Sequence, residues 1–321
     1  MLVACGGLGG GREDDGSASI GTFPTGPGTN SVGSDGTDGT ADGTADGTSS
    51  ADGTGNDDAT KFDLGIPPDA PPPSEEGCTK VDFLFIIDNS GSMDDEQANL
   101  VNSFPGFING IQSTLSQVDE YQVGVVTTDA YSPNNNVPGC NVLGGLVTKT
   151  GGSNSSNSVC GPYVAGNNYM TELDNLGTSF ACAAQVGTDG NGIERPMDAL
   201  VSVVNKVNGG PGQCNEGFLR DDALLVLVII TDEWDGPNDP EFPGSSGTPQ
   251  NWYDAVVAAK LGIPENAVAV ALINWQGSAT CPPSDSFYDG VHIRDFVNLF
   301  GANGFLGGVC EPDYGPIFSQ A

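Results

Sequence analysis

Four stretches of the chain have the apolar pattern of buried β-strands. They span residues 81–87, 121–127, 224–231 and 268–273. The first is a nearly continuous apolar run that ends at Asp88, and residues 224–231 give the strongest strand pattern of all. A strand that is apolar on both faces is typical of a parallel sheet covered by helices on both sides.

Between these stretches, apolar residues recur at helical spacing. The first such series consists of Leu100, Phe104, Phe107, Ile108, Ile111 and Leu115. Pro105 is expected to kink or split this helix. Further helices are predicted at residues 193–207, with Pro196 allowed in the first turn, and at residues 251–261 and 292–300. Strands that alternate with helices predict an α/β fold with a doubly wound, mostly parallel sheet flanked by helices.

Residues 1–75 have a different texture and are predicted to form a disordered tail. Residues 34–48 are a loose Asp-Gly-Thr repeat with almost no apolar side chains, so burial cannot offset the entropy cost of ordering. The repeat lacks the apolar position that a calcium-binding nonapeptide repeat requires. The folded domain is predicted at residues 76–321, with an insertion rich in Asn, Ser and Gly at about residues 129–187.

The net charge of −33 excludes some classes of partner. A chain this acidic is not attracted to phosphate backbones. We therefore expect neither nucleic acid nor anionic lipid as a partner. No run of eighteen apolar residues occurs, which predicts no transmembrane helix. The single histidine, His292, argues against a His-based metal site, and we expect it only to start a helix.

Cysteine usage indicates an oxidising compartment. The chain has eight Cys and no CxxC pair. Leu2-Val3-Ala4-Cys5 resembles a bacterial lipobox, which predicts lipidation of Cys5, a true start upstream of Met1 and membrane contact only through that lipid. The alternative is that Cys5 is an ordinary cysteine. Local pairing suggests the disulfides Cys140–Cys160, Cys281–Cys310 and Cys182–Cys214, with Cys78 left over.

Three polar segments lie where a doubly wound sheet binds ligands. Asp88-Asn89-Ser90-Gly91-Ser92 follows the first strand, Gly187–Gly192 precedes the second helix, and Asp232-Glu233 follows the strongest strand. Hard oxygen ligands on converging loops suit a divalent cation. The candidate ligands are Asp88, Ser90, Ser92, Thr188 and Asp232.

Other roles remain open for some of these residues. Ser92 could be a helix N-cap, with Asp95 completing a capping box. The loop of Thr188 could be a plain turn, with Thr178 as a weaker substitute ligand. Glu233 and Asp235 could form a solvated acidic loop, or they could hold a second cation such as Ca²⁺.

The three segments together resemble the metal-ion-dependent adhesion site of von Willebrand factor A (vWA) domains. The family motif is DxSxS, then a distant Thr and a distant Asp, and the resemblance covers residues 81 to about 303. It implies that Ser90, Ser92 and Thr188 bind Mg²⁺ (or Mn²⁺ or Ca²⁺) largely directly. Asp88 and Asp232 would often act through water, and an acidic group of a partner would complete the shell. Residues 83–93, 192–196 and 217–220 also look like secreted vWA lipoproteins of myxobacteria and related bacteria.

We therefore expect a non-enzymatic, extracellular adhesion protein, either secreted or anchored at the bacterial surface. Its partner would be a protein or polysaccharide with an exposed carboxylate. One alternative is a structural envelope module with a degenerate cation site. A hydrolase with Ser90 as nucleophile is more remote, because Asp88 stands where a nucleophile elbow needs Gly and only His292 could serve as base.

Overall fold

The computed structural model describes residues 79–114, 118–235, 244–275, 278, 281 and 289–320. The predicted tail, the lipidation of Cys5 and the unpaired role of Cys78 lie outside these residues. The elements below belong to the described part of the chain.

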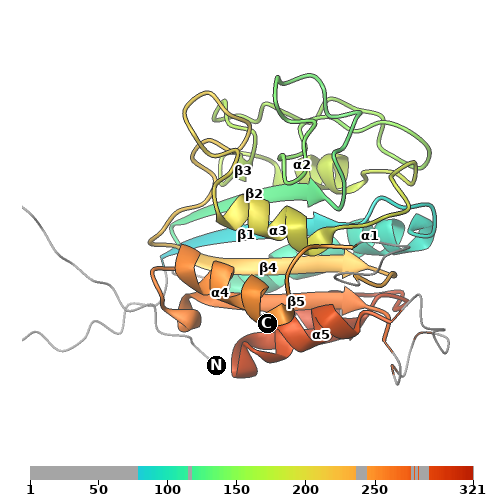
Figure 1. Ribbon diagram of the computed structural model, residues 1–321. Helices are drawn as coiled ribbons and strands as arrows, with labels where there is room; N and C mark the ends of the chain where they lie inside the picture. Colours follow the sequence, from blue (N-terminus) through green and yellow to red (C-terminus); the bar gives the residue numbers. More distant parts are fainter. Residues whose placement is uncertain are drawn as a thin grey trace, which may run out of the picture. The chain divides into compact units, whose positions relative to one another are not determined.

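A six-stranded sheet forms the centre of the fold, in the order β3-β2-β1-β4-β5-β6 (Figure 1). The strands are β1 (Lys80–Ile87), β2 (Glu120–Thr127), β3 (Met170–Thr171), β4 (Leu224–Thr231), β5 (Ala267–Ile273) and β6 (Gly304–Gly308). All pairs are parallel except β2 with β3. The chain first moves outward from β1 in one direction and then from β4 in the other, so the topology reverses between these two strands. The predicted doubly wound, mostly parallel α/β fold is confirmed.

Helices cover both faces of the sheet. They are α1 (Asp94–Thr114), α2 (Leu176–Ala184), α3 (Pro196–Val204), α4 (Pro249–Ala259), α5 (Val291–Asn298) and α6 (Gly315–Phe318), with short 3₁₀ helices at Pro264–Asn266 and Gly301–Asn303. Alternate β1 residues separate the two cores: Phe83 and Phe85 pack with α1, α2 and α6, whereas Leu84 packs with α3, α4 and α5. In Figure 1 the latter three helices lie in front of the sheet. This two-sided burial explains the nearly continuous apolar strands.

Helix α1 continues through Pro105, so the predicted split is wrong. Pro105 is exposed, and its missing N–H removes one helical hydrogen bond on the solvent side. The neighbouring Phe104 and Phe107 are buried and pack against Phe85, with ring centroids 6.0 Å away in both cases. Packing of the buried face thus outweighs the local cost of proline.

Besides the two 3₁₀ helices, two strands and two α-helices have no counterpart in the sequence prediction: β3, β6, α2 and α6. Helix α2 lies inside the segment that we expected to be irregular. It begins at an Asn175 cap, whose side chain accepts from the Thr178 N–H, and its Phe180 ring stacks on Phe104 at 3.5 Å between centroids. Strand β6 reads Gly-Phe-Leu-Gly-Gly, a composition that carries little strand preference. Tertiary contacts decide these short elements.

Three disulfides occur among the described residues, and they correct two predicted pairings. Cys281–Cys310 is confirmed, but the others are Cys140–Cys214 and Cys160–Cys182. The predicted pairs Cys140–Cys160 and Cys182–Cys214 are wrong because they joined cysteines that are neighbours in the sequence, whereas the fold brings Cys140 to Cys214 and Cys160 to Cys182. The first bond ties the insertion to the segment before β4, and the second links two parts of the insertion, because α2 lies inside it. The bonds indicate folding in an oxidising environment.

Candidate metal centre

The candidate ligands converge where the topology reverses. Ile87 of β1 is level with Ile230 of β4, so the next residues, Asp88 and Thr231–Asp232, leave the sheet side by side. The Ser92 hydroxyl donates to Asp232 Oδ1 at 3.0 Å, and the Ser90 and Ser92 hydroxyls are 3.2 Å apart. Four of the five predicted residues therefore lie in one connected group, which we call the site edge.

Asp88 forms the buried floor of the site edge. Its Oδ1 accepts from the Ser90 N–H at 2.8 Å, and its Oδ2 accepts from the Thr231 hydroxyl at 2.6 Å. The Thr128 hydroxyl donates to Oδ1 from the end of β2 at 3.4 Å. Complete burial raises the pKa of Asp88 to about 7, with a further contribution from the charge of Asp232. Because both oxygens already accept protein hydrogen bonds, Asp88 is suited to act on an ion through water.

Gln97 joins the Asp88 turn to the Thr188 loop. Its side-chain Nε2 donates to the carbonyls of Asp88 at 2.9 Å and Gly187 at 2.6 Å, while its Oε1 accepts from the Gly187 N–H at 2.9 Å. Gln97 is buried in α1. We call this set of three hydrogen bonds the Gln97 clamp. It joins the Asp88 turn, 9 residues before Gln97, to the Gly187 loop, 90 residues after it.

The Gly-rich loop around Thr188 is more than a plain turn. The Gly190 N–H donates to the Asn89 carbonyl at 2.7 Å, and a Cβ on Gly190 would lie 2.5 Å from that same oxygen. Gly187 has φ +86°, the left-handed region that favours glycine. These glycines let the loop backbone approach the Asp88 turn closely.

Thr188 reaches the site edge through its backbone. Its carbonyl would lie 3.9 Å from a Cβ on Gly91, between the two predicted serine ligands. Its hydroxyl accepts from Asn154 Nδ2 at 3.1 Å, and no contact of this hydroxyl with Ser90, Ser92 or Asp232 occurs in the described structure. The substitute, Thr178, is exposed in the first turn of α2 and is bonded there to Asn175, so Thr188 is the better candidate.

The Ser92 hydroxyl does not cap helix α1, which was the alternative role for this residue. Ser92 lies two residues before the first residue of α1, and its hydroxyl donates across the sheet to Asp232. Burial raises the pKa of Asp232 to about 6, with the charge of Glu233 adding to the shift. The contact therefore links the two strand ends directly.

Asp235 is not part of a solvated loop, which was one of the two readings of the acidic cluster. It is 1% exposed, and its carboxylate accepts from the backbone amides of Met197, at the start of α3, and of Ser245. Burial raises its pKa to about 6. Asp235 thus holds α3 and the segment before α4 together.

Glu194 adds a carboxyl group that the ligand prediction did not include. It is buried just before α3, its Oε1 has no hydrogen-bond partner, and it shares a hydrogen bond with Glu233. Burial first, and then Glu233, raises the pKa of Glu194 to about 10. Glu194 is also close enough to Asp88 for the charge of Asp88 to contribute to this shift.

The sequence does contain signals for the residues that we missed. Gln97 falls on the same helical stripe as Met93, Leu100 and Phe104, so a polar residue stands where the pattern demands an apolar one. Thr128 and Thr231 end or follow strands whose carboxyl ends meet at the site edge. Glu194 carries no such signal, since acidic residues before a helix are common.

The group combines two serine hydroxyls, one threonine loop and two aspartates, which is the oxygen-rich donor set that Mg²⁺, Mn²⁺ and Ca²⁺ prefer. Among the described residues, no cluster of three or more His, Cys, Asp or Glu side chains is arranged to hold a metal ion. The candidate set differs from such clusters because hydroxyl groups supply most of its members. The donor types present are therefore those of a site for a hard divalent cation.

His292 does not contact Ser90 in the described structure. It is the second residue of α5, with its ring 6.3 Å from that of Trp234, while the Ser90 hydroxyl lies against Ser92. The hydrolase alternative therefore has no nucleophile–base contact in this geometry.

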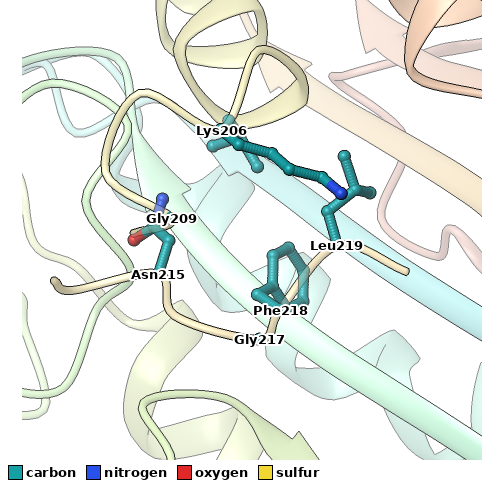
Figure 2. Close-up of a pocket in the computed structure, with 7 residues that line it drawn as sticks. Lys206, Gly209, Asn215, Gly217, Phe218 and Leu219 are labelled. Carbon is teal, nitrogen blue, oxygen red and sulfur yellow. The ribbon is translucent and has the colours of Figure 1, made fainter. Parts of the chain in front are cut away.

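A cavity of about 210 Å³ lies at the opposite end of α3 (Figure 2). It is lined by Val203, Lys206, Gly209, Asn215, Gly217, Phe218 and Leu219. Lys206 is the one charged residue of the lining, and its ammonium is paired with Asp221 at 2.7 Å. The cavity is separate from the site edge and brings no further ligands to it.

Comparison with known proteins leaves the function open. No protein-family model and no curated protein matches the chain. A solved structure that matches is proximal thread matrix protein 1 from the mussel byssus, with 13% identity, a TM-score of 0.35 and coverage of 61% of this chain. The chain spans 39% of that protein's length. A likeness at this level carries no information on ligand or function. Among the described residues, no helix is long and apolar enough to cross a membrane.

Proposed function

We propose that this protein is a vWA-type adhesion protein that binds an extracellular partner through a divalent cation at the site edge. Mg²⁺ is the preferred ion, with Mn²⁺ or Ca²⁺ as alternatives. The observation that carries the proposal is the contact chain from Ser90 to Ser92 to Asp232, with separations of 3.2 and 3.0 Å, across the reversal point of the sheet. The match to the DxSxS–Thr–Asp motif supports the same interpretation.

The residues would divide the work of holding the ion. The hydroxyls of Ser90, Ser92 and Thr188 would bind it largely directly, as neutral ligands. Asp88 and Asp232 would supply negative charge, partly through water. Neutral direct ligands leave the ion electrophilic, so it would attract a carboxylate of the partner. The proposed partner is thus a protein with an exposed Asp or Glu, or a polysaccharide with uronic acid groups.

The exposure of the residues around the proposed ion position supports a binding role. Ser92 and Gly91 are exposed, so a cation beside them would be open to a second macromolecule. The protein's own charge of −33 would repel acidic partners except where a cation intervenes. Export of the chain, with lipidation at Cys5 as its means of surface attachment, belongs to the same proposal.

Calorimetric titration of the full chain with Mg²⁺, Mn²⁺ and Ca²⁺ tests the cation site. We expect saturable binding in the wild type and at least a tenfold loss of affinity in Ser90→Ala and Asp232→Asn. Asp254→Asn is the matched control, because Asp254 is exposed on α4, away from the site edge. Absence of saturable binding in the wild type would favour the structural envelope module with a degenerate site.

A second assay addresses the partner. Immobilised polyglutamate and polygalacturonate should retain the wild-type protein in the presence of Mg²⁺ and release it with a chelator, while neutral dextran should not retain it. Asp232→Asn should abolish retention. Retention that survives chelation would mean that the cation does not mediate the contact.

A further inference from the structure

The insertion contacts the Thr188 loop through residues 150–158, which we call the support loop. The Thr188 N–H donates to the Ser153 carbonyl at 2.9 Å, and the Ser153 N–H donates to Asp189 Oδ2 at 2.8 Å. Within the described part of the chain, the Asn154 side chain is the one hydrogen-bond partner of the Thr188 hydroxyl, with Nδ2 donating at 3.1 Å. Both backbone and side chain of Thr188 are therefore held by the insertion.

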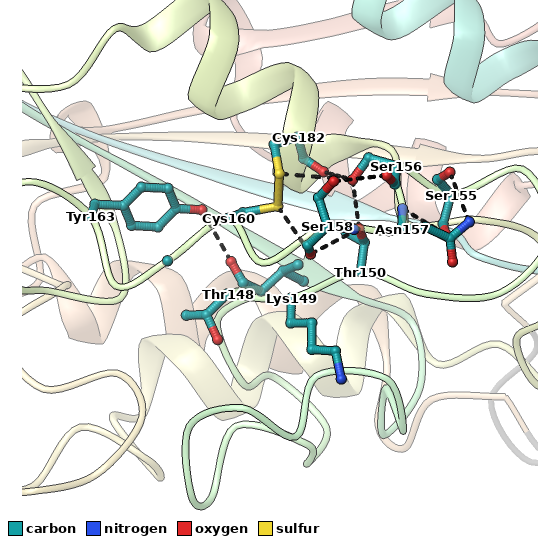
Figure 3. Close-up of a disulfide and its surroundings, with 12 residues drawn as sticks. Thr148, Lys149, Thr150, Ser155, Ser156, Asn157, Ser158, Cys160, Tyr163 and Cys182 are labelled. Carbon is teal, nitrogen blue, oxygen red and sulfur yellow. Dashed lines mark hydrogen bonds between the residues drawn. A yellow bond between two sulfur atoms is a disulfide. The ribbon is translucent and has the colours of Figure 1, made fainter.

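The support loop is itself braced by internal hydrogen bonds. Its ends are joined by the bond from the Thr150 N–H to the Ser158 carbonyl at 2.9 Å. The Ser156 hydroxyl is bonded to Thr150 and donates to the Cys182 carbonyl at 2.8 Å. Figure 3 shows these bonds around the Cys160–Cys182 disulfide, which ties the end of the loop to α2. The support loop is therefore held in place and can restrain Thr188, which it contacts.

The backbone conformation, exposure and hydrogen bonding of Asn154 indicate a role for its side chain. Its φ of +58° lies in the left-handed region, where Asn and Gly are the residues that fit best. It is exposed, so it contributes little to the core. Its amide has one contact that bears on the candidate site, the hydrogen bond to the Thr188 hydroxyl.

We propose that Asn154 is a positioning residue that sets the cation affinity by holding the Thr188 hydroxyl in one rotamer. This inference rests on the function proposed above. The donated N–H occupies one lone pair of Oγ1 and leaves the other for the ion. Without it, the hydroxyl rotates among staggered positions, and ion binding must restrict that rotation. Loss of one such hydrogen bond corresponds to a fall in affinity of about two- to tenfold.

The first measurement is the Mg²⁺ dissociation constant of the full chain carrying Asn154→Gly. Glycine accepts the left-handed backbone, so the loop can keep its course. Asn157→Gly is the matched control: Asn157 is also exposed with φ +48°, and its amide is bonded to Gly152 and Ser155 within the support loop rather than to Thr188. We expect weaker binding for Asn154→Gly alone, with the urea midpoint of metal-free protein unchanged in both variants. Equal losses in both variants would overturn the assignment to Asn154.

The second measurement needs no cation. In metal-free protein with labelled threonine, three-bond NMR couplings report the side-chain rotamer of Thr188. We expect one rotamer in the wild type and in Asn157→Gly, and averaged couplings in Asn154→Gly. A single rotamer in Asn154→Gly would refute the positioning role even if metal binds. If no cation binds the wild type, the proposed function fails, while the couplings still decide whether Asn154 positions Thr188.

Discussion

Substitution of Gln97 by alanine should weaken both the fold and the candidate cation site. The change removes all three hydrogen bonds of the Gln97 clamp, at 2.6 to 2.9 Å, from a side chain that is 2% exposed. Each bond contributes on the order of 1 kcal/mol, and buried backbone groups lose their partners, so the expected cost is about 2–4 kcal/mol. In urea denaturation this corresponds to a midpoint lower by about 1 M.

The same substitution should reduce Mg²⁺ affinity by more than about tenfold, because the Thr188 loop loses its connection to the Asp88 turn. Calorimetric titration well below the unfolding midpoint measures this effect separately from stability. Gln97→Glu is a more conservative probe: it keeps the acceptor for the Gly187 N–H but replaces a donor with an oxygen facing two carbonyls. It should also be destabilising.

Asn99→Ala is the control within the same helix, since Asn99 donates to the Glu311 carbonyl at 3.3 Å, away from the site edge. It should lose about 1 kcal/mol and bind Mg²⁺ normally. The reasoning is refuted if Gln97→Ala costs no more than this control. It is also refuted, as to function, if Gln97→Ala is unstable but binds the ion with wild-type affinity.

Further predictions concern other parts of the domain. Replacing Cys140 and Cys214 by alanine opens a 74-residue loop and should lower the free energy of unfolding by about 4 kcal/mol; a loss under 1 kcal/mol in chemical denaturation would contradict this. Burial raises the pKa of Asp88 to about 7 and the pKa of Asp232 to about 6, so protons should compete with the cation for both carboxylates. Mg²⁺ affinity should therefore fall from pH 8 to pH 5. An affinity that does not change with pH in calorimetry would argue against both residues as ligands. Because the pKa of Asp88 is raised in the folded state, the folded protein keeps a proton that the unfolded chain releases. The free energy of unfolding of metal-free protein should therefore fall as the pH rises from about 4 through 7. Urea titrations measure this fall, which should be smaller in Asp88→Asn. Asp235→Ala should lower the free energy of unfolding by about 2–3 kcal/mol, because two backbone amides lose their buried carboxylate acceptor. It should leave Mg²⁺ affinity unchanged. A parallel loss of affinity would place Asp235 in the cation site.

The regular part of the fold is predictable because burial on both faces leaves a local trace. The strongest strand prediction, residues 224–231, matches β4 residue for residue, and the predicted strand at residues 268–273 differs from β5 by one residue. Helix α2 and strand β6 leave no such trace. They are short, and contacts between distant residues, such as Phe104 on Phe180, stabilise them.

The sequence predicts those residues of the candidate site that directly follow a strand. Asp88 and Asp232 follow directly from the strand pattern, and their strands are neighbours in the sheet. The disulfide pairing could not be derived in this way, because Cys140 pairs across 74 residues and only the folded insertion brings it to Cys214. Gln97 and Asn154 act through contacts 90 and 34 residues away, which no local pattern reveals.

The insertion also affects how readily the β2 side of the sheet can pair with strands of other molecules. An exposed edge strand offers free N–H and C=O groups to strands of other molecules and so promotes aggregation. Here β3 covers only Gln122 and Val123 of β2, and the Val147 N–H of the insertion takes the Val125 carbonyl at 2.8 Å farther along. The irregular chain of the insertion, which carries two disulfide-bonded segments, thus occupies part of this row of hydrogen-bonding groups without presenting a new long strand. At high protein concentration, neighbouring copies would find fewer free backbone groups to pair with where the insertion covers β2.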